Sequence, residues 1–159
     1  MKKVLIAYFP FGETPKVAER FGKLFLEKGI NSETYIIEDK NLFNLKQQFK
    51  KEKQLELKKP FPNLSEYSLI IVGTPVASFS SAPIVNHFLK TANVEESTRV
   101  ILYATGIGLP GTTIKKMKSL LSMKNVQVLD SQVFSSIFPF DSRKLQEVNV
   151  FFEKVIKLI

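Results

Sequence analysis

The sequence predicts an α/β fold in which an open parallel sheet of five strands carries helices on both faces, giving a three-layer sandwich. Strand-like apolar runs alternate with helical patterns along the 159 residues. Three of these runs are almost continuous in Val, Ile and Leu, which is typical of strands that are buried on both faces. The length suits one domain and no internal repeat or long linker interrupts it, so we expect a single domain over residues 1–159.

The expected strands are short runs bounded by polar or turn-forming residues. The first (KVLIAY), third (SLIIVG) and fourth (RVILYA) are the nearly continuous ones, whereas the second (ETYII) and fifth (VQVL) mix polar and apolar residues. The five strands are expected at residues 3–8, 33–37, 68–73, 99–104 and 126–129.

The segments between and after these strands carry apolar stripes with the spacing of an α-helix. They are expected to be helical around residues 17–25, 84–92, 114–121 and 145–159. Asp141 or Ser142 is placed to cap the last helix. A weaker stripe at residues 42–49 runs into the break made by Pro60 and Pro62.

The composition argues against several kinds of site. The chain has no cysteine and one histidine, His87, so we expect no disulfide, thiolate chemistry, zinc site or serine-histidine-aspartate triad. No apolar run approaches the ~20 residues that span a bilayer. Because the first residues begin a strand at once, we expect no signal peptide and a cytoplasmic location.

Much of the net charge of +8 lies in one segment. Residues 40–59 hold seven lysines and two glutamates, a balance of +5. This basic segment is interpreted either as a solvated surface or as a face for an acidic partner, such as an acidic redox protein. Nucleic acid is not an expected partner, because no aromatic residue alternates with the lysines on a strand, as stacking platforms require.

The loop at residues 9–15 follows the first expected strand and has the outline of an anion site. Parallel sheets bind ligands beyond the carboxyl ends of their strands. The amides of Gly12, Glu13 and Thr14 would point outward with a helix dipole behind them, and Thr14 would add a hydroxyl. Glu13 opposes this, because one unit of repulsion at about 6 Å costs roughly 3 kcal/mol at an effective dielectric near 20. Either Glu13 turns outward, or the loop is an ordinary capped turn.

Two further loops follow the third and fourth expected strands, at residues 74–83 and 105–112. The first carries Phe79, which either stacks on a planar ligand or packs as a satellite of the core. The second contains the G-x-G-x-x-G pattern of dinucleotide-binding turns, and Asp130 lies 24 residues after Gly106. Nicotinamide binding is therefore one alternative, although that pattern belongs to the first turn of such folds. The other is a glycine loop whose amides line a flat heterocycle.

Three stretches of the sequence resemble flavodoxin-like proteins, and together they span nearly the whole chain. MKKVLIAYF, the G-E-T turn and KVAERFGKLF resemble the first strand, phosphate turn and first helix of that family. YSLIIVGTPVASFSSAPIVNHFLK resembles the third strand and the loop beside the flavin ring. RVILYATGIGLPGTTIKKMKSLL resembles the fourth strand, the second flavin loop and the helix that follows.

The resemblance implies strand order 2-1-3-4-5, with FMN lying across the carboxyl edge of the sheet. The phosphate would sit in the turn at residues 12–14, and the isoalloxazine ring between residues 75–79 and 106–111. The first turn departs from the family pattern, because Pro10 stands where a hydroxyl residue is usual and the loop is one residue short. The implied cofactor-binding residues are Phe11, Gly12, Glu13, Thr14, Pro75, Val76, Ala77, Ser78, Phe79, Gly106, Ile107, Gly108, Leu109 and Gly111.

The functional expectation follows from what the side chains lack. They offer no activated nucleophile, metal cluster or paired carboxylates, so redox chemistry would come from the flavin. We expect an FMN-binding, flavodoxin-like redox protein that transfers electrons or, if it is an enzyme, works as an FMN-dependent oxidoreductase. The alternative is a flavin-free binding or regulatory module on the same scaffold. Such a module would act through the lysines of the basic segment, namely Lys46, Lys50, Lys51, Lys53, Lys58 and Lys59.

Overall fold

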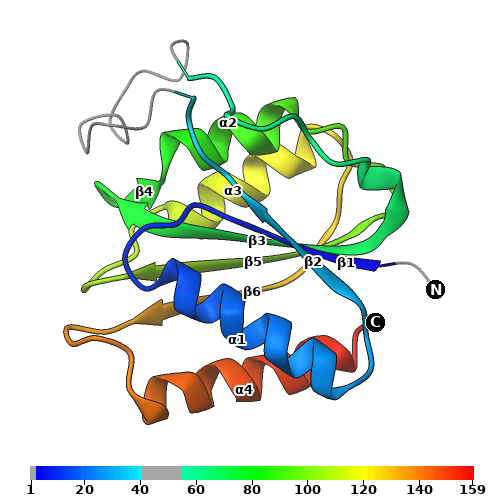
Figure 1. Cartoon of the computed structure of the whole chain (residues 1–159). Helices are drawn as coiled ribbons and strands as arrows, with labels where there is room; N and C mark the ends of the chain where they lie inside the picture. The colour runs from blue at the N-terminus through cyan, green and yellow to red at the C-terminus, as the bar shows by residue number, and fades with distance from the viewer. Residues whose placement is uncertain (1–2, 41–54) are drawn as a thin grey trace.

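Five long strands form one parallel sheet with helices on both faces, in a computed structural model that describes residues 3–40 and 55–159 (Figure 1). A two-residue strand, β4, adds an antiparallel hairpin to the end of β3. One turn of 3-10 helix at Leu64–Glu66 leads into β3. The main elements are, in chain order, β1 (Lys3–Tyr8), α1 (Thr14–Glu27), β2 (Ser32–Ile36), β3 (Tyr67–Ala77), β4 (Ser80–Ser81), α2 (Pro83–Thr91), β5 (Arg99–Gly106), α3 (Thr113–Ser122), β6 (Val128–Ser135) and α4 (Ser142–Ile156).

The order of the long strands confirms the predicted topology. The sheet runs β2-β1-β3-β5-β6, which is 2-1-3-4-5 when only the five long strands are numbered. All four pairings between these strands are parallel. Because the connections between parallel strands cross one face of the sheet or the other, the carboxyl ends of the strands meet at a single edge.

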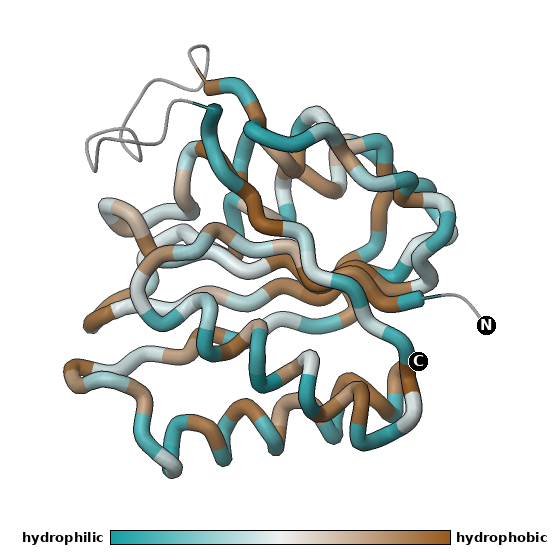
Figure 2. Tube along the Cα trace, viewed as in Figure 1, coloured by the Kyte–Doolittle hydropathy of each residue, from teal (hydrophilic) through white to brown (hydrophobic). Residues whose placement is uncertain are grey.

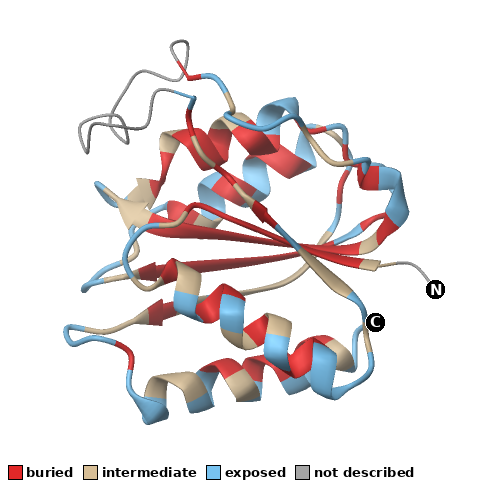
Figure 3. Cartoon of the chain, viewed as in Figure 1, coloured by how far each residue is buried: buried red, intermediate tan, exposed pale blue. Residues whose placement is uncertain are grey.

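The helices cover both faces of the sheet, so the fold has the three layers expected (Figure 1). On one face, Phe25 of α1 packs edge-on against Phe152 of α4, with ring centroids 4.8 Å apart. On the other face, Phe88 of α2 and Met117 of α3 belong to a second cluster of buried apolar residues. The central strands are apolar and buried along most of their length, as the near-continuous Val, Ile and Leu runs predicted (Figures 2 and 3).

The last strand differs from its prediction. It was expected at residues 126–129, but β6 covers Val128–Ser135 and therefore ends six residues later. Its residues are mostly half-buried, because β6 lies at the edge of the sheet with one long neighbour. The polar run Asp130-Ser131-Gln132, which marked the end of the strand in the sequence, fits inside an edge strand that water reaches from one side.

The cap of α4 is one of the two residues predicted, Asp141 or Ser142. Asp141 is the N-cap residue, and its Oδ1 accepts hydrogen bonds from the amides of Arg143 at 3.0 Å and Lys144 at 3.1 Å. These bonds satisfy two of the amides that a helix leaves without partners in its first turn. The hydrogen bond from Lys144 contributes most to lowering the pKa of the Asp141 carboxyl.

The described part of the basic segment carries paired charges. Backbone hydrogen bonds join residues 38–40 to residues 56–58. Across them, Lys40 lies 3.1 Å from the carboxylate of Glu56, and Lys58 lies 3.1 Å from that of Glu38. The weak helical stripe at residues 42–49 and the lysines at positions 46, 50, 51 and 53 lie outside the described residues. No helix among the described residues is long and apolar enough to cross a membrane.

A polar network links the amino-terminal ends of three strands. Its contribution to the stability of the fold is expected to be lost at alkaline pH. Lys3 of β1 lies 2.7 Å from Oε1 of Glu33, and the hydroxyl of Tyr67 donates to Oε2 of Glu33 at 2.6 Å. Burial raises the pKa of Tyr67, and with the bond to Glu33 brings it to about 12. In the unfolded chain the pKa of a tyrosine is about 10. The stabilisation of the folded state by the protonated Tyr67 is therefore complete below about pH 10, and it is lost as the pH rises through the pKa in the folded state.

We expect the free energy of unfolding to fall more steeply between about pH 10 and pH 12 in the wild type than in Tyr67→Phe. Urea unfolding followed by circular dichroism at several alkaline pH values measures this. Other tyrosines and lysines titrate in both proteins, so the difference between the two curves isolates Tyr67. Parallel curves would contradict the assignment.

Candidate functional site

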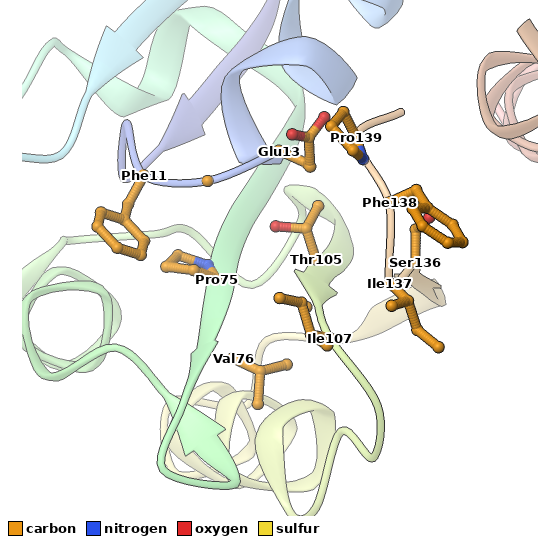
Figure 4. Close-up of a pocket in the computed structure, with 12 residues that line it drawn as sticks. Phe11, Glu13, Pro75, Val76, Thr105, Ile107, Ser136, Ile137, Phe138 and Pro139 are labelled. Carbon is orange, nitrogen blue, oxygen red and sulfur yellow. The ribbon is translucent and has the colours of Figure 1, made fainter. Parts of the chain in front are cut away.

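A cavity of about 450 Å³ opens at the carboxyl edge of the sheet (Figure 4). The last residues of β3 and β5 meet there with the connections that follow β1, β5 and β6. Seven of the residues predicted to bind a cofactor line it: Phe11, Gly12, Glu13, Pro75, Val76, Gly106 and Ile107. Five further lining residues were not predicted: Thr105, Ser136, Ile137, Phe138 and Pro139.

The turn between β1 and α1 forms one end of the cavity. Gly12 adopts a positive φ of 60°, and an added Cβ there would meet nothing within 4 Å. The Thr14 amide donates to the Phe11 carbonyl at 3.3 Å, so one of the three amides expected to face an anion already has a partner. The ring of Phe11 stacks on that of Phe9 and lines the cavity without filling it.

The hydroxyl of Thr14 is turned into the protein. The residue is fully buried, and its Oγ1 lies 2.7 Å from Oγ1 of Thr105, a lining residue on β5. The Thr14 carbonyl accepts a hydrogen bond of 2.9 Å from the hydroxyl of buried Tyr103. These contacts fix the first turn of α1 against β5, and they give the Thr14 hydroxyl a partner within the protein.

Glu13 makes a contact across the cavity end that neither sequence-based alternative anticipated. Its Oε2 accepts a hydrogen bond of 3.1 Å from the amide of Phe140 and lies 3.0 Å from Nζ of Lys16. The side chain is 27% exposed, so it is not turned fully into solvent as one alternative required. In Figure 4, Glu13 lies beside Pro139. The carboxylate therefore ties the first turn to the loop after β6.

The hairpin after β3 has an unfavourable tip. Ser78 and Phe79 both have positive φ, 50° and 61°, at the two positions between the paired residues Ala77 and Ser80. Two-residue hairpins favour such dihedrals, but Asn-Gly is the usual sequence there. Phe79 is 65% exposed, and Ala77, Ser78 and Phe79 do not line the cavity.

The glycine loop after β5 packs against this hairpin. The amide of Thr112 donates to the Phe79 carbonyl at 2.8 Å. Gly111 has a φ of 56°, and a Cβ on it would lie 2.2 Å from the same carbonyl oxygen, so glycine is required there. Gly106 and Ile107 line the cavity, whereas Gly108, Leu109 and Gly111 do not. The loop and the hairpin therefore form a single unit beside the cavity.

The loop after β6 supplies a wall that the sequence analysis missed. Ser136, Ile137, Phe138 and Pro139 line the side opposite Phe11 (Figure 4). The error in the end of β6 placed this loop outside the expected carboxyl edge. A signal was present, because the apolar run IFPF stands directly before the Asp141 cap, where a surface loop is usually polar.

Asp130 is not part of the site. It occupies the third position of β6, near the amino-terminal end of that strand, and lies 2.6 Å from Nζ of Lys154. Burial raises the pKa of this carboxyl, but hydrogen bonds from Lys154 and the Ser131 amide outweigh it and leave the pKa lowered. The acid of the dinucleotide pattern thus lies near the amino-terminal end of β6, whereas the glycine loop lies at the carboxyl edge of the sheet.

The rim of the cavity is apolar and almost uncharged. Among residues 9–13, 75–82, 105–112 and 135–140, Glu13 is the only charged residue. Six large apolar side chains are exposed on these loops: Phe11, Phe79, Ile107, Leu109, Ile137 and Phe138. Apolar side chains gathered around an opening mark a surface that binds a ligand or a partner.

Comparison with known proteins places the fold. No protein-family model matches the sequence, and no curated protein matches it either. The structure is similar to that of oxidised Flavodoxin 2 from Bacillus cereus, with a TM-score of 0.70 and 14% identity over 99% of both chains. A flavodoxin from the domain Archaea has a TM-score of 0.68 and 12% identity, over 98% of this chain and 96% of that one.

A flavoprotein from Lactobacillus acidophilus NCFM, solved in complex with FMN, gives a TM-score of 0.63 and 19% identity over 94% of this chain and 99% of that one. These similarities extend over whole chains on both sides, and the strand order agrees with them. The chain therefore has the flavodoxin-like fold.

Proposed function

We propose that this protein binds FMN at the carboxyl-edge cavity and works as a flavin-dependent redox protein. The observation that carries the proposal is the cavity itself, about 450 Å³ with mostly apolar walls at the edge where this fold ends its strands. Such a volume is within the usual range for small-molecule sites. The flavoprotein from Lactobacillus acidophilus, with the same fold, was solved in complex with FMN.

The lining fits a flat, largely apolar ring. Val76 and Ile107 offer aliphatic walls, and Phe11 and Phe138 lie on opposite sides (Figure 4). The polar side chains of the lining, apart from Glu13, are the hydroxyls of Thr105 and Ser136. Apolar walls with a few polar groups are typical of sites that hold a heterocycle in one orientation.

The lining fits a phosphate less well. Pro10 and Pro15 have no amide proton, and Thr14 is bonded within the protein through both its amide and its hydroxyl. Glu13 is the single charged residue among those that line the cavity. The group that supports phosphate binding is therefore reduced to the amides of Gly12 and Glu13.

A bound flavin would supply the oxidation and reduction that side chains cannot perform. The residues of this chain would bind and orient the ring, exclude water from its apolar faces and leave one edge open between the loops. Electron transfer and an FMN-dependent reductase activity are both compatible with this arrangement. Because this chain has a net charge of +8, the proposed partner is an acidic redox protein. Long-range attraction would bring that partner toward the apolar rim of the cavity.

Flavin titration tests the proposal. Purified protein, freed of any bound flavin, is titrated into FMN while flavin fluorescence and visible absorption are followed. Saturable quenching with a 1:1 end point is expected. A protein that is folded by circular dichroism yet leaves the flavin signal unchanged would defeat the proposal. That outcome would favour the alternative of a flavin-free binding module. The titration distinguishes the two functions because a flavin-free module is not expected to bind FMN.

A further inference from the structure

The charge at one end of the cavity bears on which flavin the site accepts. By resemblance, a phosphate would lie in the turn at residues 12–14, and the structure gives that end a carboxylate, Glu13. Glu13 is also the N-cap residue of α1, so its negative charge already lies at the positive end of the helix dipole. A dianionic phosphate at the same end would have to compete with it.

Two donors beside this carboxylate are already engaged with it. The ammonium of Lys16 lies 3.0 Å from Glu13 and forms an ion pair with it. The Phe140 amide donates to Glu13 at 3.1 Å. The cation that a phosphate could use, Lys16, is already paired with Glu13. A phosphate would therefore have to break that ion pair or bind against the repulsion of the Glu13 carboxylate.

We propose that this site prefers a flavin without phosphate, riboflavin over FMN, and that Glu13 sets the preference. The inference rests on the proposed function, because it concerns the ligand of the same cavity. FMN still enters through its ring, but its phosphate gains less from the amides of Gly12 and Glu13 than it loses to repulsion by the Glu13 carboxylate. The Glu13 carboxylate acts as a built-in anion: it pairs with Lys16, accepts from the Phe140 amide and lies at the N-terminal end of α1, although it makes no capping hydrogen bond there.

The test compares the dissociation constants of riboflavin and FMN for the same protein by fluorescence quenching at low salt. In the wild type, FMN should bind no more tightly than riboflavin. A tenfold change in affinity corresponds to about 1.4 kcal/mol, so a repulsion of half that free energy would make FMN bind roughly threefold more weakly. Glu13→Gln keeps an oxygen that can accept from the Phe140 amide but removes the charge and releases Lys16. FMN should then bind about tenfold more tightly than riboflavin, while riboflavin binding hardly changes.

Two further variants check the cause. Lys16→Gln leaves the Glu13 charge without its cation, so it should shift the preference further toward riboflavin. Glu27→Gln makes the same charge change at the other end of α1, where solvent and salt screen it, and should leave the ratio unchanged. Raising the salt concentration should also narrow the difference between the two flavins in the wild type.

The outcomes separate the two proposals. If the wild type binds FMN more tightly than riboflavin, the preference is wrong although the flavin function stands. If Glu13→Gln and Lys16→Gln leave the ratio as it was, Glu13 does not set it. If neither flavin binds a folded protein, the proposed function fails and this inference fails with it.

Discussion

Replacing Gly73 with alanine is expected to lower the free energy of unfolding by about 3 kcal/mol or more, or to prevent folding. A Cβ on Gly73 would lie 2.0 Å from Cζ of Tyr103 and 2.3 Å from its hydroxyl oxygen. The Tyr103 ring has no room to move away. It is fully buried, packs at 5.8 Å from the ring of Phe21, and is anchored by its hydrogen bond to the Thr14 carbonyl.

The measurement is urea unfolding followed by circular dichroism. Gly22→Ala is the matched control, because Gly22 lies within α1 and an added Cβ there meets nothing within 4 Å. That variant should be as stable as the wild type or more stable by up to about 1 kcal/mol, since alanine favours a helix over glycine. A Gly73→Ala protein with wild-type stability would show that Tyr103 does not occupy the space above Gly73.

The second large effect is expected from Ile107→Asp, which should weaken flavin binding by roughly tenfold to a hundredfold. Ile107 lines the cavity, and a bound ring would cover its side chain in part. A carboxylate there would lose hydration on binding and find no cation among the lining residues, a cost of about 1.4–2.7 kcal/mol in these terms. The dissociation constant from the fluorescence titration measures it.

Leu109→Asp provides the control on the same loop. Leu109 and Ile107 are both 76% exposed, but Leu109 does not line the cavity. The two variants carry the same charge change and start from equal exposure, so their difference reports on position alone. Equal losses of affinity in the two variants, or none in either, would mean that the ring lies elsewhere on the rim.

The sequence predicted most of the sheet because its central strands have a simple signature. The first, third and fourth runs are covered on both faces, and continuous Val, Ile and Leu express that burial directly. The fifth strand has a weaker signature. β6 lies at an edge and its residues are mostly half-buried, so the polar residues Asp130 and Gln132 inside it were interpreted as the end of a strand.

The site was harder to predict than the fold because its decisive contacts are distant in sequence. Glu13 is bonded to the amide of Phe140, 127 residues further along the chain. Reasoning from residues 9–15 alone predicted that Glu13 would either repel a bound phosphate or point into solvent. The Phe140 amide could not be identified as its partner from that segment. The hairpin at Ser78 and Phe79 was missed for a local reason, since neither residue is a usual choice for positive φ.

The wall formed by residues 136–139 has a consequence for the order in which the site is assembled during synthesis. A chain emerges from the ribosome with its amino-terminal portion first, so the loops after β1, β3 and β5 are made before this wall exists. The contact between Glu13 and Phe140 can close only after β6 has joined the sheet. A ligand that needs all the walls of the cavity would therefore be bound only after synthesis has passed β6 and the loop that follows it.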